Sequence, residues 1–499
     1  MVKHIIKNRN KRKPISGPTQ LQKIQSLIQS GCTTDAWKVI KSTLNIAPKD
    51  VPLLQEAAKL ARKEQNYDDS VNFYLRALEV SPNNADLLNG LGITYYNANS
   101  FEEAEKYYLA AQQADPNYIA GYNNHAILLN KTGRYEDSVR KFQMLVTRWP
   151  NLADIRYRLA IALLQIGRLE EAECELRRAQ ILRPDEISYQ LTLGLVLLQQ
   201  ERHHEGWRGY QLRHSAKNKA PYFRLPDFRQ PYWQGESLEG KRIMVMTEQG
   251  RGDEIQFCRY LTRLKHEKKA SRVLFTGREA LRPLISSLEG LDEYVLKPDE
   301  HSFDYWCMLL DLPLWFLDTP QPFVTGERYL YCNPGSQIRW PIVSDKLKVG
   351  LVWKGSTTHD NDARRSLSHF SVLAPLLTIP HIHWVSLQKG AGEDEIAQWP
   401  QVQPLGERFE NYSDTADVVD QLHLIIGVDT SVIHLAGAMG KPCWVILPDA
   451  QVDWRWLPQR EDTYWYPNMR MFPRLRSECE QAVILRIEQA LKSLFIVEK

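Results

Sequence analysis

Residues 85–118 read ADLLNGLGITYYNANSFEEAEKYYLAAQQADPNY, and the N-terminal part of the chain repeats variants of this unit. Its proline recurs every 34 residues, at Pro48, Pro82, Pro116, Pro150 and Pro184. A fixed period of this length is the sequence signature of stacked helix pairs. Because proline has no backbone N–H to donate, we expect each of these prolines to end the second helix of a unit.

Small and aromatic side chains also keep fixed places within the unit. Small residues at positions 8, 20 and 27, such as Gly92, Ala104 and Ala111, let two antiparallel helices pack closely. Tyr108, at position 24, fills the space between units. With proline at position 32, the units begin at Val51, Ala85, Ile119, Ala153 and Ile187, with a weaker unit from Gly17.

The turn between the two helices carries its own signal, because Asn99, Gly133 and Gly167 share position 15 and all tolerate left-handed backbone geometry. The whole pattern resembles the tetratricopeptide repeat (TPR). The resemblance implies an α-solenoid, a TPR superhelix over residues 17–215, whose concave groove binds peptides or segments of a partner protein. A spacer or an oligomerisation surface is the alternative interpretation.

Two segments of different composition flank this array. Residues 1–16 carry six positive charges and no acidic residue, which predicts a basic, disordered tail. The tail is short and lacks interleaved aromatic residues, so it favours a solvated terminus over nucleic-acid binding. Residues 216–240 are rich in proline, glycine and aromatic residues, among them Pro221, Tyr222 and Phe223, and predict an ordered linker.

The composition of the 499 residues is that of an ordinary globular protein, with 43% hydrophobic and 25% charged residues and a net charge of +3. No apolar run approaches the roughly 18 residues of a membrane-spanning helix, and the N-terminus does not resemble a secretory signal. The seven cysteines are dispersed without a C-x-x-C pair, which argues against disulfides and zinc and predicts reduced core residues. We therefore expect a cytoplasmic protein without a transmembrane segment.

The 34-residue repeat is replaced from Lys241 onward by a different pattern of apolar residues. Residues 243–246 form a short apolar strand, followed by a glycine loop and a helix predicted from about Glu254 to Leu264. Strand candidates alternating with helices predict two Rossmann-like halves, 241–340 and 341–499, the second with a closing C-terminal helix. The further strand candidates are residues 272–275, 293–296, 305–310, 348–353, 383–387, 424–428 and 443–447.

The segment from Asp429 to Pro442 is the most informative loop. Asp429 ends a buried strand, and Thr430 and Ser431 open a helix whose free N–H groups can hold a diphosphate. This segment resembles the D-T-[GS]-x-x-H motif of the heptosyltransferase family of GT-B glycosyltransferases, with Ser431 where that family usually has glycine. Gly250 to Asp253 is similar to that family's N-terminal loop, and the combined chain resembles bacterial TPR–glycosyltransferase fusions.

The resemblance implies a GT-B fold that transfers a sugar from a nucleotide-sugar donor with inversion, using no metal and no other cofactor. Residues 241–340 would form the acceptor side and residues 341–499 the nucleotide-sugar side. Asp253, in the glycine loop with Gly250 and Gly252, would be the catalytic base that removes the proton of the acceptor hydroxyl. The residues implied in donor binding are Asp429, Thr430, Ser431, His434, Lys354, Gly355, Ser356 and Arg365.

Each of these assignments has a structural alternative. Asp253 and Asp429 are also suited to capping a helix. His434 is equally compatible with a core histidine that has its hydrogen bonds satisfied, and Lys354 and Arg365 with ordinary cations of a surface loop.

The leading hypothesis is a glycosyltransferase that modifies a protein held by its own repeat array. One alternative keeps the chemistry but changes the acceptor to a lipopolysaccharide or another glycan. A second alternative is a TPR scaffold whose α/β part has lost activity. The nearest match to a metal-binding D-x-D sequence, residues 360–362, lies in a polar loop and does not favour a metal site.

Overall fold

The computed structural model describes residues 19–215, 225–320, 322–323, 328–332, 340–359, 361–457, 459–476 and 478–494. The chain divides into two compact units, one up to Ile166 and the other from Gly167. The predicted tail and the predicted linker residues Pro221, Tyr222 and Phe223 lie outside the described residues.

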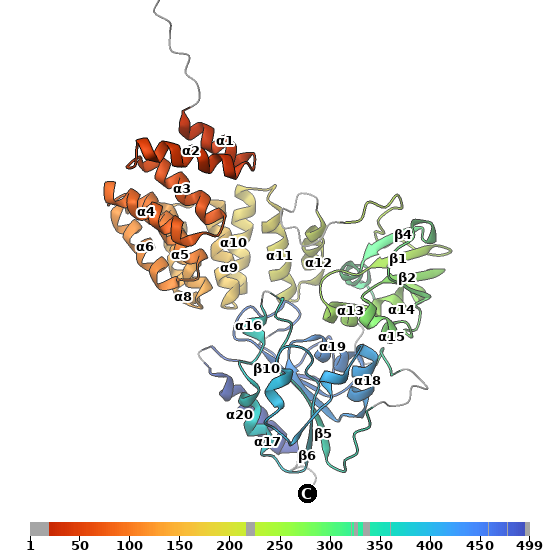
Figure 1. The fold of residues 1–499 in the computed structure, drawn as a ribbon. Helices are drawn as coiled ribbons and strands as arrows, with labels where there is room; N and C mark the ends of the chain where they lie inside the picture. The colour runs from red at the N-terminus through yellow and green to blue at the C-terminus, as the bar shows by residue number, and fades with distance from the viewer. Residues whose placement is uncertain are drawn as a thin grey trace, which may run out of the picture. The chain divides into compact units, whose positions relative to one another are not determined.

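The repeat array is a series of paired helices that begin where the proline period predicts (Figure 1). The first helices of the units are α3 (Val51–Lys63), α5 (Ala85–Asn97), α7 (Ile119–Lys131), α9 (Ala153–Gln165) and α11 (Ile187–Gln199). The second helices are α4 (Tyr67–Val80), α6 (Phe101–Ala114), α8 (Tyr135–Arg148), α10 (Leu169–Leu182) and α12 (His203–Gln211). The weaker first unit is α1 (Gln20–Gln29) with α2 (Thr33–Ile46). The predicted TPR array is confirmed.

The turns and the packing follow the predicted positions. The backbone φ of Asn99 is 59°, that of Gly133 is 80° and that of Gly167 is 69°, all in the left-handed region. Position 8 must be small because a Cβ added at Gly92 would lie 2.7 Å from the ring of Tyr108. The glycine and the tyrosine therefore fit together as one packing unit.

The N-terminal half of the α/β part is a parallel four-stranded sheet with the order β3-β2-β1-β4. Met244 of β1 is in register with Leu274 of β2 on one side and with Trp306 of β4 on the other. The described part of the predicted linker joins this sheet, because the N–H of Trp233 donates to the carbonyl of Trp306 at 2.8 Å. The strands are β1 (Arg242–Met246), β2 (Arg272–Thr276), β3 (Glu293–Val295) and β4 (Tyr305–Met308).

The helix predicted from Glu254 to Leu264 is instead two helices, α13 (Arg251–Phe257) and α14 (Arg259–His266). The break has a local cause, because side chains take two of the carbonyls that an unbroken helix would use. Nε of Arg259 donates to the carbonyl of Gln256 at 2.7 Å, and the hydroxyl of Tyr329 donates to that of Ile255 at 3.0 Å. The remaining helices of this half are α15 (Arg282–Ile285) and the 3₁₀ segment η4 (Leu309–Phe316).

The C-terminal half is a parallel six-stranded sheet with the order β10-β9-β8-β5-β6-β7. Its four predicted strands are present, and two further strands, β7 and β10, extend its edges. The strand β7 is short, and β10 runs into a proline, so neither shows the long apolar run that predicts a buried strand. The strands are β5 (Leu347–Val352), β6 (Ile382–Ser386), β7 (Val402–Pro404), β8 (Leu424–Val428), β9 (Cys443–Leu447) and β10 (Met469–Pro473).

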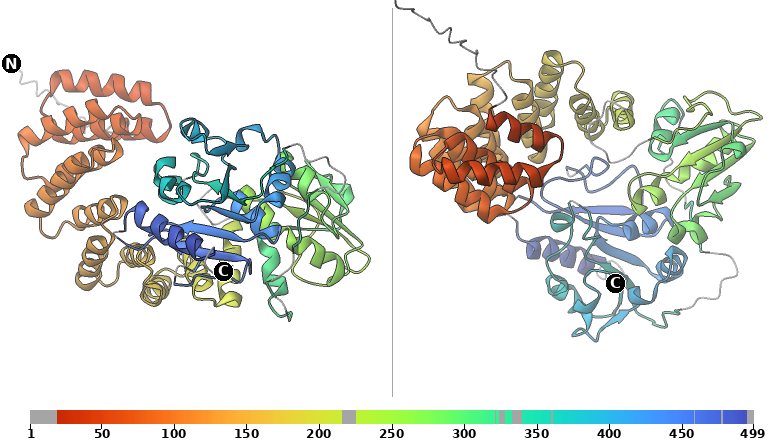
Figure 2. Two further views of the ribbon diagram at one scale, coloured as in Figure 1. Left: turned by 90° about the horizontal axis from the view of Figure 1, so that it is seen from below. Right: turned by 45° about the horizontal axis from the view of Figure 1, so that its top comes forward.

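Helices cover both faces of this sheet (Figure 2). Ile425 of β8 packs into one apolar cluster, and its neighbour Ile426 packs into another together with Ile484 of α20. Burial on both faces is typical of a parallel sheet. The helices are α16 (Asp362–Arg365), α17 (Ala374–Leu377), α18 (Tyr412–Gln421), α19 (Ser431–Ala438) and the closing helix α20 (Glu480–Leu494). The fold is thus a TPR array followed by two Rossmann-like halves, consistent with a GT-B arrangement.

The prediction of core cysteines is only partly correct. All seven cysteines are free, and Cys258, Cys307 and Cys443 are buried. The three exposed cysteines lie in the repeat array and before α20, where the sequence pattern carries no burial signal; they are Cys32, Cys174 and Cys479.

The last helix pair supplies a test of the packing, because α11 and α12 cross at two glycines. A Cβ added at Gly209 would lie 2.7 Å from the Cα of Gly194, which is backbone and cannot rotate away. We expect Gly209→Ala to lower the midpoint of thermal unfolding by the equivalent of about 1–3 kcal/mol. Gly121→Ala is the control, since its Cβ would meet no atom closer than 3.4 Å. Equal midpoints for the two variants would contradict this close crossing.

Candidate functional site

Two loops at the carboxyl ends of β1 and β8 lead into α13 and α19, and these two helices contact each other (Figure 1). Gly252 permits the contact, because a Cβ added there would lie 2.7 Å from Cδ2 of His434. A larger residue at position 252 would push the helices apart. The structure therefore brings the predicted glycine loop and the predicted donor-binding helix together.

Asp253 does not precede its helix, as the sequence suggested, but is the third residue of α13. Gly250 takes the extended backbone of the N-cap, so the chain is already helical at Arg251. The N–H of Gly250 donates to Oδ2 of Asp253 at 2.7 Å, and Nη2 of Arg455 donates to Oδ1. The side chain of Asp253 is 13% exposed to solvent, so a small molecule can still reach it.

Asp429 and His434 contact each other at the start of α19. Nε2 of the buried His434 lies 3.6 Å from Oδ1 of Asp429, and its Nδ1 lies 3.0 Å from the hydroxyl of Tyr466. Burial acts to raise the pKa of Asp429, but the hydrogen bond and charge of His434, with the charges of Arg365 and Arg455, outweigh it and lower the pKa to about 2. Asp429 is therefore a carboxylate at neutral pH.

The N-terminus of α19 lacks a side-chain cap. Thr430 is the N-cap residue, but its side chain makes no capping hydrogen bond, and its Oγ1 is buried without a partner among the residues that the structure describes. Ser431, unlike Thr430, has a side-chain partner, because its hydroxyl lies 2.6 Å from that of Tyr412. The first N–H groups of a helix have no partner within the helix, so this turn offers hydrogen-bond donors.

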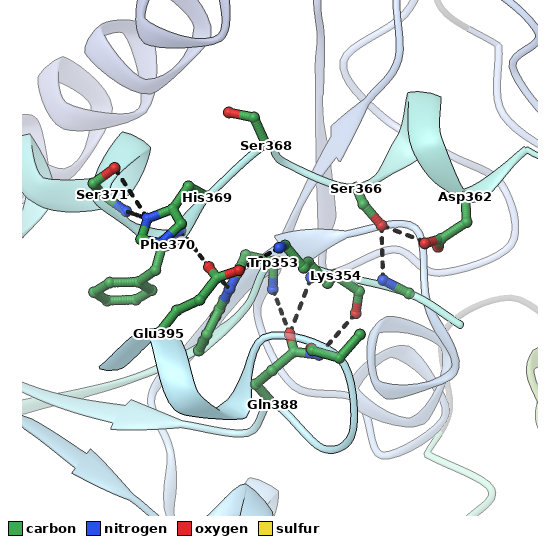
Figure 3. Close-up of polar contacts among 12 residues, drawn as sticks. Trp353, Lys354, Asp362, Ser366, Ser368, His369, Phe370, Ser371, Gln388 and Glu395 are labelled. Atoms are coloured by element: carbon green, nitrogen blue, oxygen red, sulfur yellow. Dashed lines mark hydrogen bonds and ion pairs between the residues drawn. The ribbon is translucent and has the colours of Figure 1, made fainter. Parts of the chain in front are cut away.

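Lys354 is engaged by the neighbouring residues Glu395 and Gln388 (Figure 3). Its ammonium group pairs with Oε1 of Glu395, and its backbone N–H donates to Oε1 of Gln388 at 3.0 Å. Oε2 of Glu395 accepts from Nε1 of Trp353 at 3.0 Å and from the N–H of Phe370 at 2.6 Å. The cation predicted to bind the donor thus already serves as a partner of Glu395.

Arg365 is coupled by its charge to Asp429. That charge lowers the pKa of Asp429, and Nε of Arg365 lies 3.3 Å from Oδ1 of Asp362. The backbone of Gly355 lies close to the guanidinium, because an added Cβ would be 2.7 Å from Nη2 of Arg365. The hydroxyl of Ser356 pairs with a neighbouring threonine of its own exposed loop, at 2.8 Å. Of the four loop residues predicted to bind the donor, Arg365 and Gly355 are therefore the best placed.

A buried charge cluster that the sequence did not reveal lies beside the glycine loop. Arg213, just after α12, places Nη2 2.6 Å from Oε1 of Glu248 and Nη1 2.7 Å from Oδ1 of Asp311. The hydroxyl of Tyr232 donates to the other oxygen of Asp311. Each residue alone looks like a surface charge in the sequence. Their burial together depends on β1, η4 and the end of the array meeting in space.

This cluster ties the last repeat to the candidate site. Nε2 of Gln249, in the glycine loop, donates to the hydroxyl of Tyr210 of α12 at 2.6 Å. The rings of Trp207, also in α12, and Trp454 pack edge to face with their centroids 5.1 Å apart. The end of the array is therefore part of the second unit and supports the loop that carries Asp253.

Comparisons with known proteins agree with this architecture. A family model described as tetratricopeptide repeat matches residues 56–119 and 123–187. Protein FlbA of Caulobacter vibrioides is 29% identical over 353 residues, covering 64% of this chain and 58% of its own length. The chain thus spans less than two thirds of this relative, and the match is longer than the repeat array, so it extends into the α/β part.

Solved structures are similar to part of this chain. One is YrrB, described as a TPR protein with an unusual peptide-binding site, with 17% identity, 35% of this chain and 89% of that chain covered, and a TM-score of 0.29. Another is PilW, a type IV pilus biogenesis factor. It is 19% identical, the match covers 40% of this chain and 94% of PilW, and the TM-score is 0.36.

Among the residues that the structure describes, no helix is long and apolar enough to cross a bilayer. In the same ranges, no three side chains of His, Cys, Asp or Glu gather as a metal site.

The charge cluster predicts a large effect of Arg213→Met. This variant leaves Glu248 and Asp311 buried without their guanidinium, which we expect to cost about 3–5 kcal/mol of the second unit's stability at pH 7. Thermal unfolding followed by circular dichroism measures the loss. Arg208→Met, at an exposed position of α12, is the matched control and should leave the midpoint unchanged.

The pH dependence of this difference follows from Asp311. Burial acts to raise its pKa, but the charge of Arg213, with the hydrogen bonds of His214 and Tyr232 and the charge of His214, outweighs burial and lowers it. Without Arg213 the pKa of the buried Asp311 rises, so the folded variant takes up a proton at a higher pH than the folded wild type does. Because the two unfolded chains titrate alike, the difference in stability between wild type and Arg213→Met should narrow as the pH falls from the raised pKa in the variant to the lowered pKa in the wild type. A gap independent of pH would contradict the pairing.

Proposed function

We propose that this protein is a glycosyltransferase that moves a sugar from a nucleotide-sugar donor, with inversion, onto an acceptor hydroxyl. The observation that carries the proposal is the N-terminus of α19, where the buried hydroxyl of Thr430 has no partner in the part of the chain that the structure describes, next to α13 and its Asp253. A helix N-terminus with unused donors is suited to a diphosphate. A carboxylate beside it is suited to accept a proton.

The same residues have distinct parts in the proposed reaction. The acceptor hydroxyl gives its proton to Asp253 while its oxygen forms a bond to C1 of the sugar. The bond from C1 to the diphosphate breaks, and its electron pair leaves with the diphosphate. The N–H groups at the start of α19 and the charge of Arg365 stabilise that developing negative charge.

We further propose that the acceptor is a protein segment held by the repeat array. TPR arrays present an extended surface that few small molecules would fill, and their usual ligands are peptides. A glycan acceptor would need no such surface, so the two acceptor classes are separable by experiment.

The proposal is tested first on the donor. The purified protein is offered a panel of nucleotide sugars, and release of nucleoside diphosphate is measured. We expect turnover of at least one donor, and a loss of about 10²–10⁴-fold in kcat for Asp253→Asn, because the amide cannot accept the proton. Donor binding, measured by calorimetry, should remain.

The control separates chemistry from helix capping. Asp68→Asn, in the first turn of α4 and exposed, should leave the rate unchanged. Loss of a cap costs about 0.5–2 kcal/mol of stability, so unfolding is measured for both variants. If the Asp253→Asn protein is less stable but turns over the donor at the wild-type rate, Asp253 is a helix-capping residue and not the catalytic base.

The acceptor proposal is tested by truncation at the boundary between the two units. Removing residues 1–166 should leave donor hydrolysis intact and abolish modification of cellular proteins. Removing residues 1–215 should also unfold the α/β part, because Arg213 and Tyr210 are lost with it. Undiminished protein modification by the chain that starts at Gly167 would rule out acceptor capture by the first unit.

A further inference from the structure

Arg455 joins the two halves of the α/β part at the candidate site. Its Nη2 pairs with Oδ1 of Asp253, from the N-terminal half, and its Nη1 lies 2.8 Å from Oδ1 of Asp453. The guanidinium carbon lies 4.7 Å from the ring centroid of Trp454 and 5.5 Å from that of Phe257. Only 6% of the residue is exposed, so its position is fixed by packing and by two carboxylates.

One donor of this buried guanidinium is unused. Nε of Arg455 has no hydrogen-bond partner among the described residues, although it is buried. An unmatched buried donor costs free energy unless a ligand satisfies it, and such atoms in folded proteins point to ligand sites. Thr430 Oγ1, at the start of α19, is unmatched in the same way.

The charge of Arg455 reaches the start of α19. It contributes to lowering the pKa of Asp429, the residue before the N-cap Thr430, and Asp429 in turn acts on Arg455. Arg455 therefore touches the proposed base and is electrostatically coupled to the proposed diphosphate site.

We propose that Arg455 is a positioning residue for sugar transfer, which orients Asp253 in the empty site and donates to the diphosphate of the bound donor. This inference rests on the proposed function. Oδ2 of Asp253 is held by the N–H of Gly250, so the bond of Arg455 to Oδ1 fixes the rotation of the carboxylate. During transfer Arg455 stays protonated, Asp253 receives the proton of the acceptor, and the diphosphate leaves with the electron pair of the broken bond.

The planar fork of arginine is required for this arrangement. It presents five N–H donors in fixed directions, so it can hold Asp253 and Asp453 and still offer Nε–H to a phosphate oxygen. Lysine carries the same charge on a single nitrogen and cannot reproduce these directions. The inference therefore predicts different behaviour for arginine and lysine at the same position.

The test compares Arg455→Lys, Arg455→Gln and the double variant Asp453→Asn/Arg455→Gln, which removes one carboxylate together with the cation. We expect kcat to fall by about 10²-fold or more in all three, the loss typical for one donor to a developing charge. Binding is measured with the diphosphates of adenosine, guanosine and uridine. For each diphosphate that the wild type binds, the dissociation constant of the variants should rise by about 10-fold, the effect of losing one charged hydrogen bond. Added guanidinium should partly restore the rate of an Arg455→Ala protein.

The pH profile distinguishes positioning from a merely structural role. The charged or titratable groups coupled to Arg455 are Asp253, Asp453, Asp429 and Tyr210. Removing the cation makes a neighbouring carboxylate easier to protonate, so the acidic limb of kcat/KM should move to higher pH in Arg455→Gln. If Arg455 only supports packing, the unfolding midpoints of the variants fall, but the rate per folded molecule and the acidic limb of kcat/KM stay at wild-type values. That result overturns the inference about Arg455 and leaves the proposed function standing. A wild-type protein that binds no nucleoside diphosphate and turns over no donor overturns the proposed function as well.

Discussion

The close approach of α13 to α19 is the constraint on which the candidate site depends. It exists because residue 252 has no side chain, so that the ring of His434 can lie against the backbone of α13. His434 is itself fixed by Tyr466, by Asp429 and by a stacked Trp456, whose ring centroid is 5.4 Å away. Each half alone would carry only a loop and a helix terminus. Their contact places a carboxylate from one half beside a helix N-terminus of the other.

The end of the repeat array is built into the same framework. In an open parallel sheet, the crevice lies where neighbouring strands lead to opposite sides, here between β1 and β4. Arg213 fills this crevice, paired with Glu248 after β1 and with Asp311 after β4. A buried arginine between two carboxylates is stabilising only while all three are present. The last repeat is thus a support of the α/β part, whereas the repeats up to Ile166 form a unit of their own.

The period of the array and the apolar runs of the strands made most of the fold predictable. A 34-residue spacing fixes the start of the first helix in each unit from Val51 onward, and β8 and β9 are continuous apolar runs. The site was less predictable, because a motif gives the place of Asp253 and Asp429 but not their partners. Arg455 and Arg213 contact residues 202 and 35 positions away. Sequence alone also favoured Lys354, whose partner Glu395 becomes visible only once the loops around β5 and β6 are in place.

The electrostatics of the site explain why it needs more than one cation. Arg455 faces Asp253, Asp453 and Asp429, so carboxylates outnumber the guanidinium at the centre of the site. A diphosphate brings further negative charge and would be repelled by this group of residues acting alone. In the proposed function, the N–H groups at the start of α19 and the charge of Arg365, which acts on Asp429, offset that repulsion. Nη1 and Nη2 of Arg455 keep the two carboxylates in the proposed function, while Nε, which has no partner among the described residues, takes up a phosphate oxygen. One guanidinium thereby couples the leaving group to the base, so that a donor with a shortened or uncharged leaving group would lose rate as well as affinity.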